Sequence, residues 1–243
     1  MTVYRLDLAY DGTGFHGCAR QPGVRTVQGE VERALVLHTG PVETSVAGRT
    51  DRGVHATGQV MSFTTEAGLD VDRVRRSLNR MLRPEIAVAA LQPAAEGFHA
   101  RFSATGRAYT YLVLDQETPD PFLAGTAWHY GRPLDIDRMA AAAVHFVGEH
   151  DFASLCRSAQ GRSTVRRVTS VAWRRPRAGL AAFDVAATSF CHQMVRSMVA
   201  VCVEVGRGLV QPDAVPSILE ACDRHAAKGV APPHGLTLVR VDY

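Results

Sequence analysis

Lysine is almost absent from this chain, which contains only Lys228, so nearly all of its positive charge is arginine. Cysteine is scarce as well: the five cysteines are odd in number, and none belongs to a Cys-x-x-Cys pair. We therefore expect neither a disulfide framework nor a zinc site, and a reducing cytoplasm fits this composition. No apolar run is long enough to cross a bilayer, and the N-terminal stretch has no signal-peptide pattern, so no membrane association is expected.

Several motifs of common enzyme classes are missing too. The chain has no Walker phosphate loop, no Gly-x-Gly-x-x-Gly after a strand, no Gly-x-Ser-x-Gly and no His-Glu-x-x-His. These absences argue against a nucleotide-binding enzyme, a serine hydrolase and a zinc protease. The net charge of +3 permits nucleic-acid binding without requiring it. Guanidinium groups can bind phosphate through two parallel hydrogen bonds and can stack on bases.

Hydrophobic periodicity predicts the order strand, helix, strand, strand, helix, strand, and then the same order again. The first set comprises strands at 3–10, 44–47, 59–64 and 86–91, with helices capped by Thr26 and Asp70. The second comprises strands at 108–114, 165–173, 180–187 and 236–241, with helices at 136–146 (capped by Asp135), 190–205 and 212–225. We expect an α+β protein of two ferredoxin-like halves, residues 1–104 and 105–243. They would form one extended antiparallel sheet with helices on one face and a central RNA-binding cleft.

The loop around Asp51 is where we expect chemistry. Gly48 and Gly53 flank Arg49-Thr50-Asp51-Arg52, so the backbone there can turn tightly and approach another molecule. A carboxylate between two arginines stays ionised, which suits a nucleophile or a base. The plainer alternative is an aspartate that only hydrogen-bonds its own turn.

Arginines gather on one face of the helix predicted after Asp70, opposite its apolar residues. They are Arg73, Arg76, Arg80 and Arg83. This face is either solvated, or follows a phosphate backbone, or lies on a membrane surface; the lack of exposed Trp or Phe argues against the membrane. A second basic group consists of Arg157, Arg162, Arg166 and Arg167.

The stretch from Ala47 to Ala56, Ala-Gly-Arg-Thr-Asp-Arg-Gly-Val-His-Ala, resembles the signature of the tRNA pseudouridine synthase A family. Further blocks resemble this family in the same order along nearly the whole chain. They are Tyr10-Asp11-Gly12, Thr57-Gly58-Gln59-Val60, residues 98–104, residues 107–111, Met194-Val195-Arg196 and Gly235-Leu236-Thr237-Leu238.

The resemblance implies isomerisation of uridine to pseudouridine at positions 38, 39 and 40 of the tRNA anticodon stem-loop, without metal or cofactor, by a homodimer. It makes Asp51 the catalytic residue. Tyr109 would pack against the target base, Arg196 would pair with Asp51, Arg49 would help displace the target nucleotide, and Leu236 would belong to the substrate site. Whether Asp51 attacks C1′, attacks C6 or removes a sugar proton stays open.

Two stretches depart from the family pattern. Gly17-Cys18-Ala19 stands where Gly-Trp-Gln is usual, and Ser197 and Ala200 stand where Asn and Gly are usual. We expect neither to touch the catalytic set, although the first could alter RNA contacts or packing near it. Two rival functions are a non-catalytic RNA-binding protein and a metal-dependent hydrolase. The second would need another acidic ligand near Asp51, which the local sequence lacks.

Overall fold

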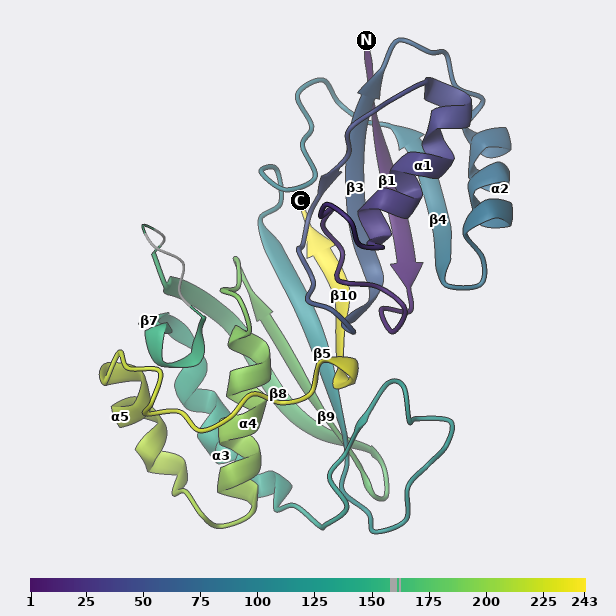
Figure 1. Ribbon diagram of the computed structural model, residues 1–243. Coiled ribbons are helices and arrows are strands. Elements are labelled where there is room, and N and C mark those ends of the chain that lie inside the picture. The colour runs from purple at the N-terminus through teal and green to yellow at the C-terminus, as the bar shows by residue number, and fades with distance from the viewer. Residues whose placement is uncertain (158–160, 162) are drawn as a thin grey trace. The chain divides into compact units, whose positions relative to one another are not determined.

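The fold is seen in a computed structural model that describes residues 1–157, 161 and 163–243, so that Arg162 lies outside the described residues (Figure 1). The chain divides into two compact units: residues 1–105 with 237–243, and residues 106–236. Both combine an open sheet with helices, which confirms the predicted α+β class. No helix in the described part of the chain is both long and apolar enough to cross a membrane.

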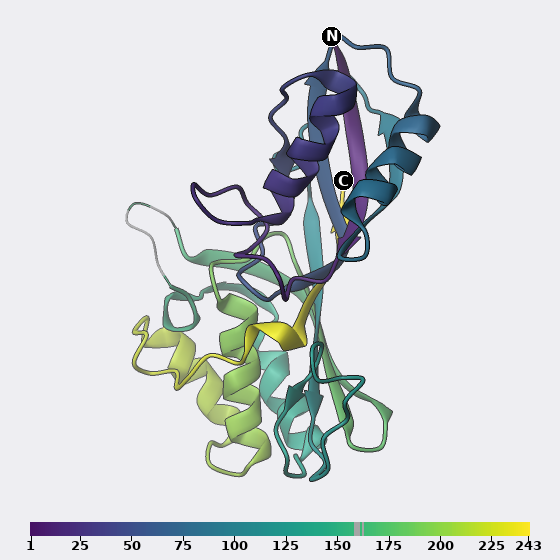
Figure 2. The ribbon, with the colours of Figure 1, turned by 45° about the vertical axis from the view of Figure 1, so that its right-hand side comes forward.

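The first unit follows the predicted order of elements. It contains β1 (Thr2–Tyr10), α1 (Val27–Thr39), β2 (Ser45–Val46), β3 (His55–Thr65), α2 (Val71–Leu82), β4 (Ile86–Pro93) and most of β10 (Leu236–Asp242). Strand β1 lies between β4 and β3 and is antiparallel to both, while β2 pairs with β3. Helices α1 and α2 lie on the same face of this sheet (Figure 2).

Local sequence accounts for both helices of this unit. The Thr26 hydroxyl accepts a hydrogen bond from Gly29 N, and the Asp70 carboxylate accepts one from Arg73 N, so each side chain caps its helix. The apolar faces are buried as expected; α1 buries Val27, Val31, Ala34 and Leu35, and α2 buries Val74, Leu78 and Leu82. Helix α2 contacts β4 and α1, and alternate residues of β1 are buried as well.

The last strand is where the boundary expected from the sequence differs from the structure. The sequence pattern places all of 105–243 in the second half, whereas residues 237–243 belong to the first compact unit. The reason is pairing: β10 runs parallel to β3, with Thr237 opposite His55 and Leu238 opposite Ala56 (Figure 1). That each unit is a separate ferredoxin-like domain stays a proposal.

The second unit adds short elements that the sequence did not predict. It contains β5 (Gly106–Leu114), β6 (Trp128–His129), α3 (Ile136–Ala143), β7 (Gly148–Asp151), β8 (Val165–Arg177), β9 (Leu180–Ala187), α4 (Met194–Gly206) and α5 (Val215–Glu220). Single 3-10 turns lie at Val144–Phe146 (η1), Ala153–Leu155 (η2), Pro212–Ala214 (η3) and Pro233–Gly235 (η4). Its sheet has the order β5-β9-β8-β7, and all three pairings are antiparallel.

All three helices of this unit are shorter than predicted, and α3 ends at Ala143 rather than at residue 146. Helix α4 starts at Met194 rather than at residue 190, because Gln193 has a left-handed φ of 66° that a helix cannot include. Helix α5 ends at Glu220, and Cys222 has a φ of 47°. Helix α3 begins where expected, with the Asp135 carboxylate accepting from Arg138 N.

Candidate functional site

The Asp51 loop is a short connection between β2 and β3. Arg49 is exposed, Thr50 is buried and Asp51 is half-buried. Val54 N donates to the carbonyl of Asp51 at 3.1 Å, and Gly53 takes a φ of 78°, so the chain turns back directly after Asp51. Strand β3 begins at His55, four residues before the predicted strand, which leaves the loop little freedom.

A buried glutamine on β3 holds the first part of this loop. The Gln59 side chain is fully buried, its Nε2 donates to the carbonyl of Gly48 at 2.7 Å, and its Oε1 accepts from Gly48 N at 3.1 Å. Both polar groups of one backbone residue are thus bound by one carboxamide, much as a neighbouring strand would bind them. The peptide before Arg49 is thereby fixed.

A tyrosine on β1 holds the second part. The Tyr10 hydroxyl lies 2.8 Å from Thr50 Oγ1, and Gln59 Nε2 donates to the same hydroxyl at 3.3 Å. The phenol oxygen thus links the buried Gln59 to the hydroxyl of Thr50. Burial raises the pKa of Tyr10 well above its usual value, so the phenol stays neutral. Thr50 is therefore buried, between the exposed Arg49 and the half-buried Asp51.

The segment after β1 packs against the same loop. A Cβ on Gly12 would lie 2.0 Å from the carbonyl oxygen of Val54, so any side chain there would push the loop away. Cys18 N donates to the carbonyl of Thr50 at 3.1 Å, and Gln59 Nε2 lies 3.4 Å from Cys18 Sγ. The departure from the family pattern at Cys18 therefore falls among the residues that support the loop, not among exposed ones. Burial raises the pKa of the Cys18 thiol to about 12.

The other predicted site residues belong to the second unit. Tyr109 lies on β5 and is buried, with its ring edge-on to Phe190 at a centroid distance of 5.1 Å. Arg196 is half-buried on α4; its Nε donates to the carbonyl of Ala231 at 2.7 Å, and Ala231 N donates to the carbonyl of Arg196 at 3.1 Å. Leu236 is buried at the start of β10.

Comparison with known proteins gives a full-length match. The family described as tRNA pseudouridine synthase matches residues 8–103 and 142–243. The chain belongs to this family. The tRNA pseudouridine synthase A of Frankia casuarinae is 46% identical over 98% of this chain and 88% of its own length. That of Moorella thermoacetica is 42% identical over 100% of both chains, and that of Bacillus subtilis is 41% identical over 98% of both. Members of the family are isomerases that act on tRNA.

Solved structures are more distant. The protein in a Cbf5–Nop10–Gar1 complex is 14% identical, and the match covers 97% of this chain and 48% of that one with a TM-score of 0.42. A likeness at this level adds nothing to the family assignment, which rests on sequence.

The arginine face of α2 is open to solvent in this pseudouridine synthase. All four predicted arginines, Arg73, Arg76, Arg80 and Arg83, are exposed, and within the described residues none of them forms an ion pair. Arg75, by contrast, lies 3.7 Å from the carboxylate of Asp72. Of the second basic group, Arg157 and Arg167 are exposed and Arg166 is half-buried.

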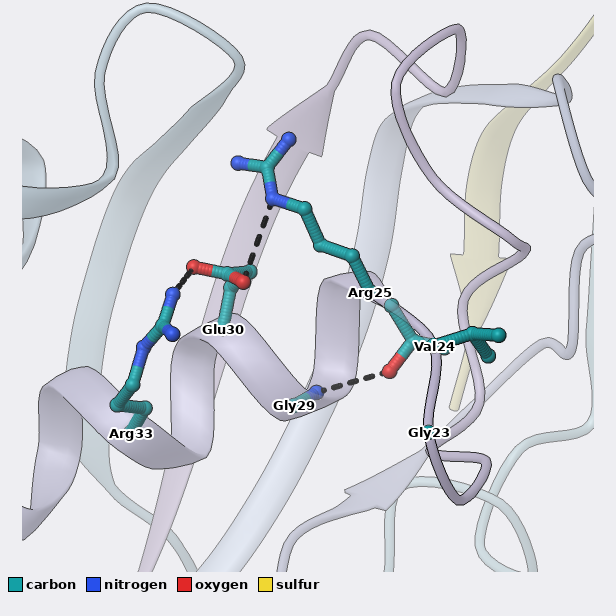
Figure 3. Close-up of a pocket in the computed structure, with 7 residues that line it drawn as sticks. Gly23, Val24, Arg25, Gly29, Glu30 and Arg33 are labelled. Carbon is teal, nitrogen blue, oxygen red and sulfur yellow. Dashed lines mark hydrogen bonds and ion pairs between the residues drawn. The ribbon is translucent and has the colours of Figure 1, made fainter.

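A surface depression lies at the start of α1, and none of the predicted site residues lines it. Arg25, Thr26, Glu30 and Arg33 line it, together with Gly23, Val24 and Gly29 (Figure 3). Both guanidinium groups are already neutralised: Glu30 binds Arg33 and Arg25, and Arg25 also binds Glu85 through two hydrogen bonds of 2.9 and 2.7 Å. Across the described ranges, no group of three or more His, Cys, Asp or Glu side chains is arranged to hold a metal ion.

Proposed function

We propose that this chain isomerises uridine to pseudouridine in the anticodon stem-loop of tRNA, at positions 38, 39 and 40, and that Asp51 starts the reaction. The observation that carries the proposal is the loop itself. Buried Gln59, Tyr10 and Thr50 fix the backbone on both sides of Arg49, and the half-buried Asp51 follows directly in the same fixed loop. A reactive group held in this way needs little reorganisation when substrate arrives.

The reaction breaks the bond between C1′ of the ribose and N1 of uracil, turns the base, and joins C1′ to C5. The proton on C5 is then lost and N1 gains one, so substrate and product have the same atoms. An ionised Asp51 could attack C1′, attack C6 or remove a proton from the sugar, and these three routes remain alternatives. The proposal includes no metal and no cofactor, as the family resemblance implies.

The remaining site residues take roles around the target nucleotide. A uridine in a stem must leave the stack before its sugar is reachable, at a cost of a few kcal/mol. We assign Arg49, exposed beside Asp51, to displacing that nucleotide, and Tyr109 to packing on the flipped base, with its ring held by Phe190. Leu236 would border the base, and Arg196 would pair with Asp51. We further propose a homodimer that binds one tRNA in the cytoplasm.

The test is release of tritium from tRNA labelled at C5 of its uracil bases, with a chelator present. Each uridine converted loses its C5 hydrogen to water, so release counts turnovers. A tRNA with cytidine at positions 38, 39 and 40 serves as control and should release none. Binding of both tRNAs without any release would favour the alternative of a non-catalytic RNA-binding protein.

Gln59 offers a test of the loop support. In Gln59→Glu an oxygen replaces the Nε2 that donates to Gly48, leaving that carbonyl without its partner at a cost of about 1–3 kcal/mol. We expect kcat to fall up to about 10²-fold through misplacement of Asp51, with tRNA affinity changed little. Single-turnover tritium release and filter binding measure the two effects.

Asn79 provides the matched control. Its Nδ2 donates to the carbonyl of Val88 at 2.8 Å and its Oδ1 accepts from Val88 N at 2.7 Å, so it binds one backbone residue in the same way as Gln59. Asn79→Asp should lower the melting temperature and leave kcat of the folded protein near that of the wild type. Equal loss of kcat in both variants would show that Gln59 acts on stability alone.

The arginine face of α2 gives a separate prediction. If these side chains bind phosphates, replacing Arg76 and Arg80 by alanine should weaken tRNA binding and flatten its salt dependence. The slope of log K against log salt concentration should become less steep by about 0.7 to 0.9 for each arginine–phosphate interaction removed. Arg207→Ala, which removes an arginine already paired with Glu204 at 2.7 Å, is the control. An unchanged slope in the double variant would mean that this face is simply solvated.

A further inference from the structure

Two cysteines of the second unit lie next to each other. Cys156 follows the 3-10 turn η2, and Cys191 lies in the bend before α4. The residue after each cysteine takes part in a backbone hydrogen bond between the two segments: Arg157 N donates to the carbonyl of His192 at 3.0 Å. The two thiols act on each other electrostatically, and the Sγ of Cys191 also donates to the carbonyl of Thr164 at 3.7 Å. Cys156 is buried, while Cys191 is partly exposed. A small oxidant can therefore reach Cys191, and the buried Cys156 lies in the neighbouring segment.

Charged groups around this thiol pair favour a thiolate. The guanidinium of Arg166, on β8, acts on both sulfurs, and Arg224 also acts on Cys156. The buried Nε of Arg166 has no hydrogen-bond partner within the residues that the structure describes. Asp151 is the nearby group that opposes a negative sulfur.

The interaction between the two thiols favours a thiolate on Cys191 rather than on Cys156. The hydrogen bond from Cys156 and the charge of Arg166 lower the pKa of Cys191 to about 7, against burial and Asp151, which raise it. The same hydrogen bond, together with burial, raises the pKa of Cys156 far above its usual value. At neutral pH about half of Cys191 is then thiolate, the nucleophilic form. Cys202, in contrast, is fully buried, and burial raises its pKa to about 12.

We propose that Cys156 and Cys191 form a reversible disulfide when the protein meets a peroxide. The Cys191 thiolate attacks the peroxide and becomes a sulfenic acid, releasing water or an alcohol. The sulfur of Cys156 then attacks the sulfenic sulfur, its proton leaves with the hydroxyl as a second water, and the S–S bond forms. Two thiols are oxidised by two electrons, and one peroxide is reduced. A thiol reductant reverses the change by thiol–disulfide exchange.

A disulfide here would tie two segments that carry candidate tRNA-binding residues. The segment after Cys156 begins with the exposed Arg157 and leads to β8, and α4 after Cys191 carries Arg196. Tethering them should slow tRNA modification, on the order of tenfold, since small displacements near reacting groups have effects of this size. This consequence rests on the proposed function; formation of the disulfide does not.

The first experiment measures the thiols without tRNA. Reduced full-length protein is treated with a small excess of hydrogen peroxide, quenched in acid, alkylated with N-ethylmaleimide and digested. We expect a peptide that links Cys156 to Cys191, and this link should disappear on treatment with dithiothreitol. The exposed Cys222 makes Cys222→Ser the matched control, which should keep the link, whereas Cys191→Ser should not form it. Preferential oxidation of Cys222, or over-oxidation of Cys191 without a link, would overturn the proposal.

The second experiment follows the rate of Cys191 alkylation against pH in the reduced protein. The rate should rise through a midpoint near 7 in the wild type. In Cys156→Ala, which lacks the donor, the midpoint should move up toward the usual thiol value of about 8.5. Cys156→Ser keeps a hydroxyl donor and should fall between the two. Identical profiles for wild type and Cys156→Ala would show that the two side chains do not interact, contrary to the proposal.

Tritium release then compares the reduced, oxidised and re-reduced protein. Slower release from the disulfide form, recovered after reduction, supports the regulatory consequence, and an unchanged rate with the disulfide intact rejects it. If even the reduced protein releases no tritium, the proposed function fails while the disulfide result stands. Cys191→Ser, which lacks the thiol that reacts with peroxide, should form no disulfide, and its rate should respond neither to peroxide nor to reductant.

Discussion

The Asp51→Asn variant is expected to bind tRNA within a few-fold of the wild type and to release essentially no tritium. An amide of nearly the same shape keeps the packing of the loop, but it is neither a nucleophile nor a base. Removing a residue in either role typically costs on the order of 10⁴-fold or more in kcat. The measurement is single-turnover tritium release, with filter binding on the same preparation.

The control for this variant is Asp72→Asn. Asp72 is an exposed carboxylate at the start of α2, near Arg75, and its substitution makes the same change of charge away from the Asp51 loop. The control should retain full activity. Turnover by Asp51→Asn within tenfold of the wild type would remove Asp51 from the mechanism and leave the plain turn aspartate as its role.

Much of the fold follows from local signals that the chain carries plainly. Thr26, Asp70 and Asp135 each cap the helix that the sequence predicts after them. The alternation of buried residues along β1 matches its sequence pattern. Local sequence patterns do not predict which distant strands pair with each other. Nothing within residues 236–241 indicates that this strand pairs in parallel with His55 and Ala56 on β3.

The shorter elements escape prediction for a related reason. Strands β6 and β7 are two and four residues long, too short for a periodic pattern to emerge from composition. The late start of α4 depends on one backbone angle at Gln193, which is a residue type that normally favours helix. Tertiary context decides such positions.

For the candidate site too, the sequence indicates one part and misses another. The motif points to the Asp51 loop directly, but the residues that hold it come from β1, β3 and the segment between β1 and α1. One signal was available in the sequence: Gln59 is a polar residue in an apolar strand, and a buried carboxamide must find partners. The Cys156–Cys191 pair gives no such signal, because the two residues are far apart in sequence and do not form a Cys-x-x-Cys motif. Its existence depends wholly on the packing of the second unit.

Arg196 is the remaining residue whose replacement should have a large effect. It lies half-buried on α4, between the buried Val195 and Ser197. Its Nε donates to the carbonyl of Ala231, whose own N–H bonds back to the carbonyl of Arg196, so the guanidinium is held in a fixed orientation. A rigid, partly buried arginine is suited to binding a carboxylate through two parallel hydrogen bonds. We propose that Asp51 is this carboxylate.

Arg196→Met is expected to lower kcat by on the order of 10²- to 10³-fold, because it removes the charge that balances Asp51; breaking a fully buried pair costs roughly 3 to 5 kcal/mol. Arg196→Lys should recover only part of the activity, since an ammonium cannot reproduce the planar fork. Arg138→Met is the matched control: its Nε also approaches a backbone carbonyl, that of Val205, at 3.4 Å near the far end of α4. This control should reduce stability at most.

A double-mutant cycle decides whether Arg196 acts through Asp51. Residual activity of Asp51→Asn is too low to divide further, so the cycle is measured on the free energy of unfolding and on tRNA affinity. If the two side chains pair, the effect of Arg196→Met should shrink or vanish in the Asp51→Asn background, because the charge that Arg196 balances is already gone. Additive effects of the two substitutions would show that they act independently. Arg196 would then serve only to anchor α4 to Ala231, and a different cation would have to balance Asp51.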